Sequence, residues 1–433
     1  MNDALPEGNV FSNRNYRLVF FGALVSELGA MLYSFAVSFY ILEISDNNAF
    51  LQGLYLAVCG VVLLLFTPVG GVLGDRVNKA KIMYLCDYAR GAVILLATAA
   101  MLLLRTPRAQ IFVLFAVGVL GNAVGGVFSP AAGALLPHIV REEQLQQANA
   151  YYSMKNALLS IFGIVLAGVL YAALSIYLLF FIVGVCYLLS GVSEMFIRYE
   201  HRPSEERLTL RLALADMGEG LRYLRGEKAI LALSIAILFI NFFFAPVSSN
   251  FIPFFVKTDL ARAPSYLFDS FLTPELWYSV LGVLIGVSTL LGSLILSARP
   301  QKEKCAFRTA LLLCAETLVM VAFTVGYLLL VSRGVSLNAF LILLSVGCLL
   351  TGYLVVLIDI PLSTVLMRRV ERDKLSKVSS ILSVASQGLV PISSVLSGAI
   401  LQLFGSAPLL AVCTAGFTLT ALMLLFNKSA REI

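Results

Sequence analysis

The chain has 433 residues, of which 59% are hydrophobic and only 13% charged, and its mean hydropathy is +0.91. This composition excludes a water-soluble globular protein. The net charge of +6 does not indicate nucleic-acid binding, because the basic residues gather in short loops between apolar runs rather than in one stripe. We therefore expect the lipid bilayer, and no nucleic acid, as the partner of most of the surface.

Apolar runs of about twenty residues recur about twelve times along the chain. A helix needs roughly 20 apolar residues to cross about 30 Å of hydrocarbon, whereas a β-barrel would show short alternating strands. The pattern predicts an all-α integral membrane protein. The expected spans lie near 16–43, 51–74, 82–104, 108–136, 152–173, 176–197, 229–256, 277–298, 307–331, 337–367, 376–403 and 405–427.

An even number of spans places both termini on one side of the membrane. The loops on that side hold Arg14, Arg17, Arg76, Lys79, Lys81, Arg141, Lys155, the basic residues from Arg198 to Lys228, Arg299, Lys302, Lys304, Arg308 and the cluster Arg368 to Lys377. The opposite loops hold only Arg105, Arg108, Lys257, Arg262 and Arg333. The positive-inside rule therefore predicts that both termini and the long middle loop are cytoplasmic.

The chain divides into two similar halves around one charged stretch. We expect an N-terminal six-helix bundle over 1–197, a cytoplasmic linker with an amphipathic helix over 198–228, and a C-terminal six-helix bundle over 229–433. Leu145 precedes Gly168 by 23 positions, as Leu375 precedes Gly398 in the second half. Such a repeat suggests two bundles related by an axis along the membrane normal, with a site between them.

The first predicted break on the cytoplasmic side carries the most specific motif. Its residues Gly71, Asp75, Arg76 and Lys79 match the loop signature of the major facilitator superfamily, while Asn78 stands where that signature has Gly. Because Asn tolerates a left-handed backbone, we expect the tight turn to persist. The chain resembles this superfamily over essentially its whole length.

Within the superfamily, the chain is similar to the drug–proton antiporter branch with macrolide-efflux and enterobactin-exporter-like proteins. The supporting stretches are Asn15-Tyr16-Arg17 with Ser26-Glu27-Leu28-Gly29, Asp87-Tyr88-Ala89-Arg90, and Leu135-Leu136-Pro137, Glu142-Glu143-Gln144-Leu145 and Ala148-Asn149-Ala150. One feature departs from the branch: antiporters commonly have Pro after a Gly in span five, where this chain has Gly163 and then Ile164.

This resemblance implies a bacterial cytoplasmic (inner) membrane protein that uses protons to drive efflux of lipophilic or amphipathic small molecules by alternating access. It also implies a monomer that needs no cofactor. Its signature Asp, here Asp75, would act as a latch against the helix that starts near Ser376, because a carboxylate is favoured at a helix N-terminus. Asp87 and Arg90, three residues apart on one helix face, would pair and belong to the same cytoplasmic gate. The alternatives are that Asp75 and Arg76 are loop charges that only set topology, and that Asp87 and Arg90 form a simple local ion pair.

Placing an ionisable side chain inside a membrane span costs free energy, so each one that occurs there indicates a function or a bonding partner. Glu27 lies about 16 Å into span one and Asp359 about 12 Å into span ten, from a helical rise of 1.5 Å per residue. Ser34 and Ser38 share the helix face of Glu27. The resemblance places spans one, four, seven and ten around a central cavity, so both carboxylates are candidates for proton coupling or substrate binding. Alternatively, each carboxyl bonds a neighbour and never titrates.

Three asparagines complete the predicted cavity: Asn122 in the Gly-rich span four, and Asn241 and Asn250 in span seven, which Pro246 and Pro253 interrupt. Three other acidic residues have structural interpretations. We expect Glu316 to be a packing contact or an interfacial group, and Glu43 and Glu194 to lie at span ends within reach of the interface.

An intramembrane enzyme is the competing class of function. The chain has only two histidines, His138 and His201, and no HExxH, G-x-S-x-G or Walker A sequence, so we expect no catalytic residues, no metal site and no ATP use. A lipid or siderophore exporter or translocase of the same fold, or a facilitator without proton coupling, stays open. The predicted partners are thus a small-molecule substrate, protons and lipid.

Overall fold

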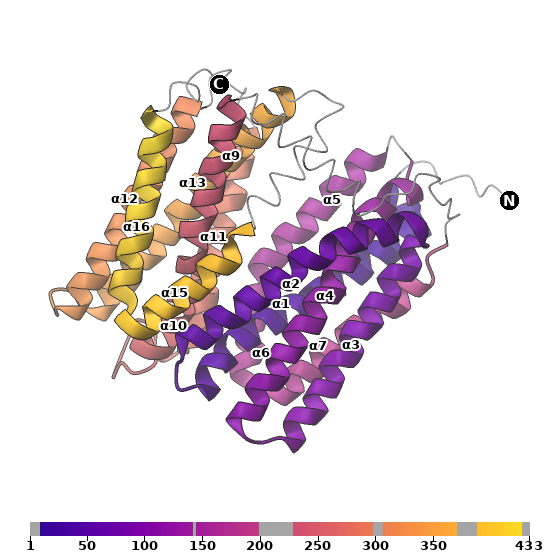
Figure 1. The fold of residues 1–433 in the computed structure, drawn as a ribbon, viewed down its shortest axis with the longest axis horizontal. Coiled ribbons are helices and arrows are strands. Elements are labelled where there is room, and N and C mark those ends of the chain that lie inside the picture. The colour runs from indigo at the N-terminus through magenta and orange to yellow at the C-terminus, as the bar shows by residue number, and fades with distance from the viewer. Residues whose placement is uncertain (1–8, 142–143, 199–227, 298–305, 370–387, 427–433) are drawn as a thin grey trace. The chain divides into compact units, whose positions relative to one another are not determined.

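The computed structural model describes residues 9–141, 144–198, 228–297, 306–369 and 388–426 (Figure 1). Within these ranges every regular element is a helix, and eleven helical stretches are long and apolar enough to cross a membrane. A twelfth apolar helix, Val390–Phe404, is shorter. The prediction of an all-α membrane protein with about twelve spans is confirmed.

The outside of these helices is apolar as well as the inside. Leu96, Phe112 and Leu318 are 71%, 75% and 69% exposed. A soluble protein would bury such side chains, but lipid tails solvate them at no cost, so the exposed leucines and phenylalanines agree with a bilayer surrounding.

Tertiary contacts group the chain into two compact units. Unit 1 comprises Met1–Tyr40 and Val58–Ala213, and unit 2 comprises Ile41–Ala57 and Leu214–Ile433. The turn between the first two membrane helices therefore belongs to unit 2, although the bodies of the same helices belong to unit 1.

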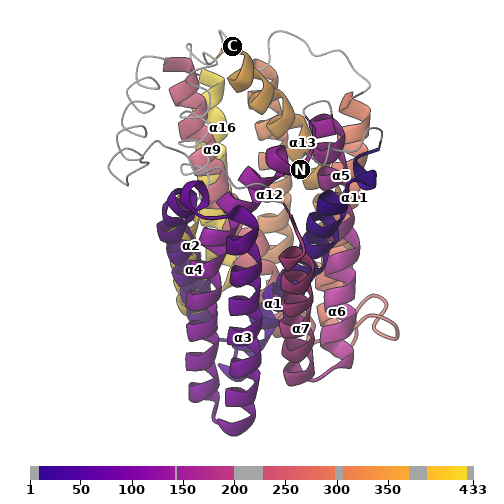
Figure 2. The same ribbon diagram turned by 90° about the vertical axis from the view of Figure 1, so that its right-hand side faces the viewer.

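Unit 1 is built from the first six membrane spans. Its elements are α1 (Arg14–Ile44), α2 (Ala49–Arg76), α3 (Lys79–Leu103), α4 (Pro107–Ile139), α5 (Leu145–Leu158), the π-helical turn η3 (Leu159–Gly163), α6 (Ile164–Ala173) and α7 (Ile176–Met195). The short η1 (Val10–Ser12) precedes them. Helix α3 packs along both α4 and α7 (Figure 2). This packing places charged residues of α3 inside the unit.

The residues of the branch-type motifs meet at one end of unit 1. Tyr16 is 1% exposed, and its hydroxyl donates to the carbonyl of Ala148 on α5 at 3.1 Å. Asn15 accepts from the backbone N–H of Arg198, just after α7, at 3.0 Å. These bonds join the start of α1 to α5 and to the end of α7. The motif residues Asn15 and Tyr16 therefore hold the ends of these three helices together.

Unit 2 holds the remaining spans. Its elements are α9 (Lys228–Pro246), the π-helical turn η4 (Val247–Phe251), α10 (Ile252–Phe255), the π-helical turn η5 (Val256–Leu260), α11 (Pro274–Ser297), α12 (Ala306–Val331), α13 (Leu337–Arg369), α15 (Val390–Phe404) and α16 (Ser406–Phe426). Helix α12 packs against α13 and α16, and α16 packs against α9 (Figure 1). Ala236, Leu313 and Phe417 are among the residues that fill the space between them.

The superfamily signature differs from the predicted loop. Gly71 to Arg76 form the last turns of α2, and the connection to α3 is only Val77 and Asn78. The expectation of a left-handed turn at Asn78 is wrong, because its φ is −52°. The Asn78 side chain instead caps α3 by accepting from the N–H of Lys81 at 3.2 Å. An Asn serves here because it is a strong helix N-cap.

Among the described residues, spans five and seven have irregular backbone. Span five contains the π-helical turn η3 directly before Ile164, and regular α-helix in span seven ends at Pro246 before η4. A Cβ on Gly163 would lie 2.8 Å from the Met31 sulfur of α1, so η3 also brings span five close to α1. Most of the linker 198–228 and the start of span eleven near Ser376 lie outside the described residues.

Candidate functional site

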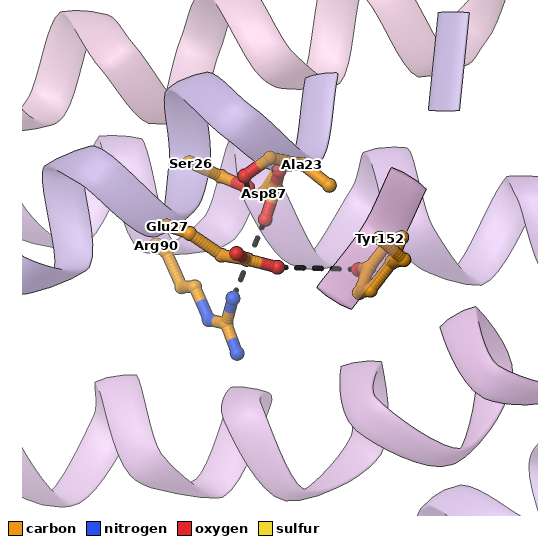
Figure 3. A network of polar contacts seen from close by, with 6 residues as sticks. All are labelled: Ala23, Ser26, Glu27, Asp87, Arg90 and Tyr152. Carbon is orange, nitrogen blue, oxygen red and sulfur yellow. Dashed lines mark hydrogen bonds and ion pairs between the residues drawn. The ribbon is translucent and has the colours of Figure 1, made fainter. Parts of the chain in front are cut away.

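Glu27 of α1 lies in a polar cluster with two residues of α5. Its Oε1 accepts from Lys155 Nζ at 2.6 Å. The same oxygen accepts from the Tyr152 hydroxyl at 3.1 Å (Figure 3). Lys155 Nζ also lies 3.6 Å from the centroid of the Tyr152 ring. The two partners of Glu27 stand three residues apart on one helix, which puts both on the same face.

The members of this pair differ in exposure. The Lys155 side chain is 1% exposed, whereas that of Glu27 is 38% exposed. Both hydrogen bonds are accepted by Oε1, which leaves Oε2 as the oxygen that can take up a proton or a positively charged group. A buried ammonium is costly unless an opposite charge lies beside it, and Glu27 supplies that charge.

Lys155 is not a cytoplasmic loop cation, although its place in the sequence predicted one. The sequence gives only its position along the chain and does not show that its side chain pairs with Glu27 inside a helix bundle.

The predicted serines lie on the face of Glu27. Ser34 is exposed, and so is Ala30, which lies between Glu27 and Ser34 along the helix. Ser38 is half-buried. This face is less covered than the rest of α1, where Leu32, Ala36 and many others are buried. Asp359 of α13 is also exposed. It belongs to unit 2, whereas Glu27 and both serines belong to unit 1.

Asn122 and Asn241 bond to their own helices. Each side-chain amide donates to the carbonyl four residues earlier: Asn122 to Gly118 at 2.8 Å and Asn241 to Ile237 at 2.9 Å. Their half-buried side chains therefore offer the amide oxygen as the group for another partner. Their role in a cavity stays a prediction.

Asn250 is buried and bonds to a neighbouring helix, and its expected place in a cavity stays a prediction. It is 0% exposed and donates to the Ser394 carbonyl at 3.0 Å and to Ser397 Oγ at 2.6 Å, both on α15. The residue lies in the π-helical turn η4, where the extra residue rotates every later side chain around the axis. A helical wheel for a regular helix cannot show this rotation.

A second charged cluster lies between α3 and α7. Arg90 Nη1 lies 3.4 Å from Asp87 Oδ1, as the spacing of three residues predicted (Figure 3). The Arg90 guanidinium also lies 4.8 Å from the Phe128 ring centroid and 5.6 Å from that of Tyr187. Gly125 makes room for it, because a Cβ there would lie 2.8 Å from Arg90 Nη2.

Glu194 belongs to the same cluster, although sequence reasoning placed it within reach of the interface. It lies in the last turn of α7 and is 0% exposed. Gly22 of α1 packs against it, with its ideal Cβ position 3.4 Å from Glu194 Cγ. The available signal was the continuation of the buried stripe Gly184, Tyr187, Gly191 and Glu194 along one helix face.

The other predicted gate residues are only partly described. Gly71, Asp75 and Arg76 lie in the last turns of α2, and their side chains lie outside the described part, as does the proposed latch partner near Ser376. Lys79 is the first residue of α3 and is buried. On α12, Glu316 is a packing contact, since it is buried and accepts from Thr351 Oγ1 at 2.8 Å.

The chain is similar to known membrane transporters. The sequence model of the protein family Major Facilitator Superfamily matches residues 19–392. The chain is 24% identical to the uncharacterized MFS-type transporter YvqJ of Bacillus subtilis (strain 168), over 99% of this chain and 96% of that protein. It is 22% identical to macrolide efflux protein A of Streptococcus pyogenes, over 55% of this chain and 58% of that protein.

Two solved structures show the same fold. The nucleoside transporter NupG superposes with a TM-score of 0.70 at 11% identity, covering 95% of this chain and 98% of that chain. A POT family transporter in complex with 5-aminolevulinic acid superposes with a TM-score of 0.72 at 14% identity, covering 97% of each chain. At these identities the likeness concerns the fold alone.

Proposed function

Since the chain belongs to the Major Facilitator Superfamily and is therefore a membrane transporter, we propose that it exports lipophilic or amphipathic small molecules in exchange for protons, by alternating access. The similarity to macrolide efflux protein A supports the direction of transport. We also propose the bacterial inner membrane as its location, with both termini in the cytoplasm, because the basic loops follow the positive-inside rule.

The observation that carries the coupling is the geometry of Glu27. The buried Lys155 and Tyr152 both donate hydrogen bonds to its Oε1. The carboxylate is partly exposed, and its other oxygen, Oε2, is therefore the one available to a proton or a substrate. A proton on Oε2 removes the negative charge that a positively charged substrate would bind. Proton and substrate therefore oppose each other at one group, and such negative coupling is the thermodynamic requirement for exchange.

The test is transport by purified protein in proteoliposomes, with a panel of lipophilic cations and an imposed pH gradient. We expect gradient-driven movement by the parent and a loss of tenfold or more in Glu27→Gln. The double variant Glu27→Gln with Lys155→Gln removes both charges together and controls for the effect of an unpaired lysine on folding. Glu316→Gln, a change at a buried carboxyl of unit 2, is the matched control and should transport like the parent.

Equal gradient-driven movement in the parent and Glu27→Gln would show that Glu27 does not couple transport, and Asp359→Asn would be tested next. Substrate transport at the same rate with and without the pH gradient, in the parent and in every variant, would indicate a facilitator without proton coupling.

The burial of Lys155 favours a second candidate, the transport of an anionic amphiphile such as a lipid or a siderophore. Protonation of Glu27 would leave the Lys155 ammonium without its counter-charge, so an acidic substrate group would then bind more tightly. Here proton and substrate assist each other, and they would move together. Replacing the cation panel by an anionic amphiphile, with the pH gradient applied in each direction, separates the two candidates by the gradient that drives accumulation.

A further inference from the structure

Asp87 and Glu194 are two carboxyl groups inside one helix bundle, and both are 0% exposed. They come from helices that pack closely along each other, α3 and α7, and they interact electrostatically. Ser190, one turn before Glu194 on α7, is the neighbouring hydroxyl on the Asp87 side. Two negative charges at such a place are costly, because the surroundings cannot hydrate them.

The hydrogen bonds around the pair are incomplete. Within the described part of the chain, both oxygens of Glu194 have no hydrogen-bond partner. The two donors near the pair lie on the Asp87 side: Arg90 faces Asp87 Oδ1, and the Ser190 hydroxyl lies within reach of the same carboxyl. A carboxylate only accepts hydrogen bonds, so an ionised Glu194 would have no donor beside it. A protonated Glu194 supplies the missing donor itself.

Arg90 bonds to Asp87 but makes no hydrogen bond to Glu194, with which it interacts only electrostatically. Its Nη1 faces Asp87, its Nη2 points towards the space beside Gly125 of α4, and its plane lies against the rings of Phe128 and Tyr187. The remaining groups that face the pair are a thiol, three hydroxyls and a glycine: Cys86 of α3, Tyr187 and Ser190 of α7, Tyr152 of α5 and Gly22 of α1. Lys155 is already bonded to Glu27. The described surroundings thus provide one cation for two carboxyl groups.

We propose that Asp87 and Glu194 form a proton-binding site that holds one proton at neutral pH, with the proton on Glu194 and the negative charge on Asp87 beside Arg90. The site is separate from the Glu27 cluster, since Glu27 is partly exposed and has its own cation. Tyr152 connects the two, because its hydroxyl donates to Glu27 and it also interacts with Glu194. In the proposed antiport, on which this role rests, the pair stores the proton that Glu27 takes up or gives away.

The experiment is infrared spectroscopy of the purified full-length protein in lipid nanodiscs, which detects the carbonyl band of a protonated carboxyl group. We expect this band at neutral pH in the parent and at the same intensity in Glu27→Gln, and we expect a weaker band in Glu194→Gln, where only other protonated carboxyls such as the buried Glu316 would remain. Asp87→Asn should weaken the band to the same extent, because Glu194 then becomes the counter-ion of Arg90. The band requires no substrate, so a failed transport assay would remove the role in antiport and leave the proton site standing.

Absence of the band in the parent, or a band of full intensity in Glu194→Gln, would overturn the proposal. Thermal unfolding provides a second measurement. Gln has the shape and donor of a protonated Glu, so Glu194→Gln should unfold at the temperature of the parent at neutral pH. A marked fall in that temperature would mean that an ionised Glu194 stabilises Arg90, which contradicts a shared proton.

Discussion

Glu27 and Lys155 form a single ion pair, but removing one charge is not equivalent to removing the other. The ammonium is 1% exposed and the carboxylate is 38% exposed. An unpaired Glu27 can still be hydrated, whereas an unpaired Lys155 stays buried without a counter-charge. The pair is therefore asymmetric in its energetics, and the buried partner sets the stability cost.

This asymmetry gives a prediction for thermal unfolding in nanodiscs. We expect Glu27→Gln to lower the free energy of unfolding by about 1–3 kcal/mol, less than for a fully buried pair because water screens Glu27. Lys155→Gln should cost less than Glu27→Gln, and the double variant should recover part of the loss. Equal costs for the two single variants would contradict the unequal burial.

At the scale of elements, small residues decide how closely helices of one unit approach. Gly126 of α4 lies against the backbone of α2: a Cβ there would be 2.9 Å from the Leu63 carbonyl oxygen and 2.9 Å from the Phe66 carbonyl carbon. Gly121, five residues earlier on the same helix, has nothing within 4 Å. Backbone atoms cannot move aside as a flexible side chain can, so only one of these glycines is required for packing.

We predict that Gly126→Ala lowers the free energy of unfolding by about 1–3 kcal/mol, because the added methyl group forces α2 and α4 apart. Gly121→Ala should be neutral or slightly stabilising, since Ala is the better helix former. The two variants would be compared by thermal unfolding in the same lipid. A neutral Gly126→Ala would mean that the two helices are not in close contact.

The two asparagines of span seven also have different roles. Asn250 crosslinks this span to α15, whereas Asn241 bonds its own helix. We predict that Asn250→Ala costs about 1–2 kcal/mol, in the upper range for hydrogen bonds between membrane helices, and that Asn241→Ala costs less than about 0.5 kcal/mol. Thermal unfolding of both variants tests this difference, and a larger cost for Asn241→Ala would contradict the assigned bonds.

For the whole molecule, the distribution of charge predicts orientation in the membrane. On the predicted outer side, Lys257 is held by Glu43 and Glu275, each at 3.2 Å, so one of the few basic residues there is neutralised by ion pairs within unit 2. The basic residues near the termini are far more numerous. By the positive-inside rule, this imbalance predicts that the side with the termini stays in the cytoplasm.

We therefore predict that a reporter enzyme fused to the C-terminus is active when the reporter requires the cytoplasm and inactive when it requires the outer side. Fusion after Arg105, in a predicted outer loop, should give the opposite result. The pair of fusions distinguishes a reversed topology, in which both results exchange, from an odd number of spans, in which both fusions report the same side.

The sequence by itself determined the membrane location, the helical class, the approximate number of spans and the family, because each of these depends on local hydropathy and on short motifs. It also predicted the Asp87–Arg90 pair, since residues three apart on a helix are neighbours whatever surrounds them. Only the tertiary structure decided that Lys155 pairs with Glu27, that Glu194 is buried beside Asp87, and that Asn250 bonds α15. Those contacts depend on which helix faces meet and on π-helical turns that shift the register. Lipid accepts apolar side chains on every face, so the amphipathic pattern that would orient a soluble helix is weak in these spans.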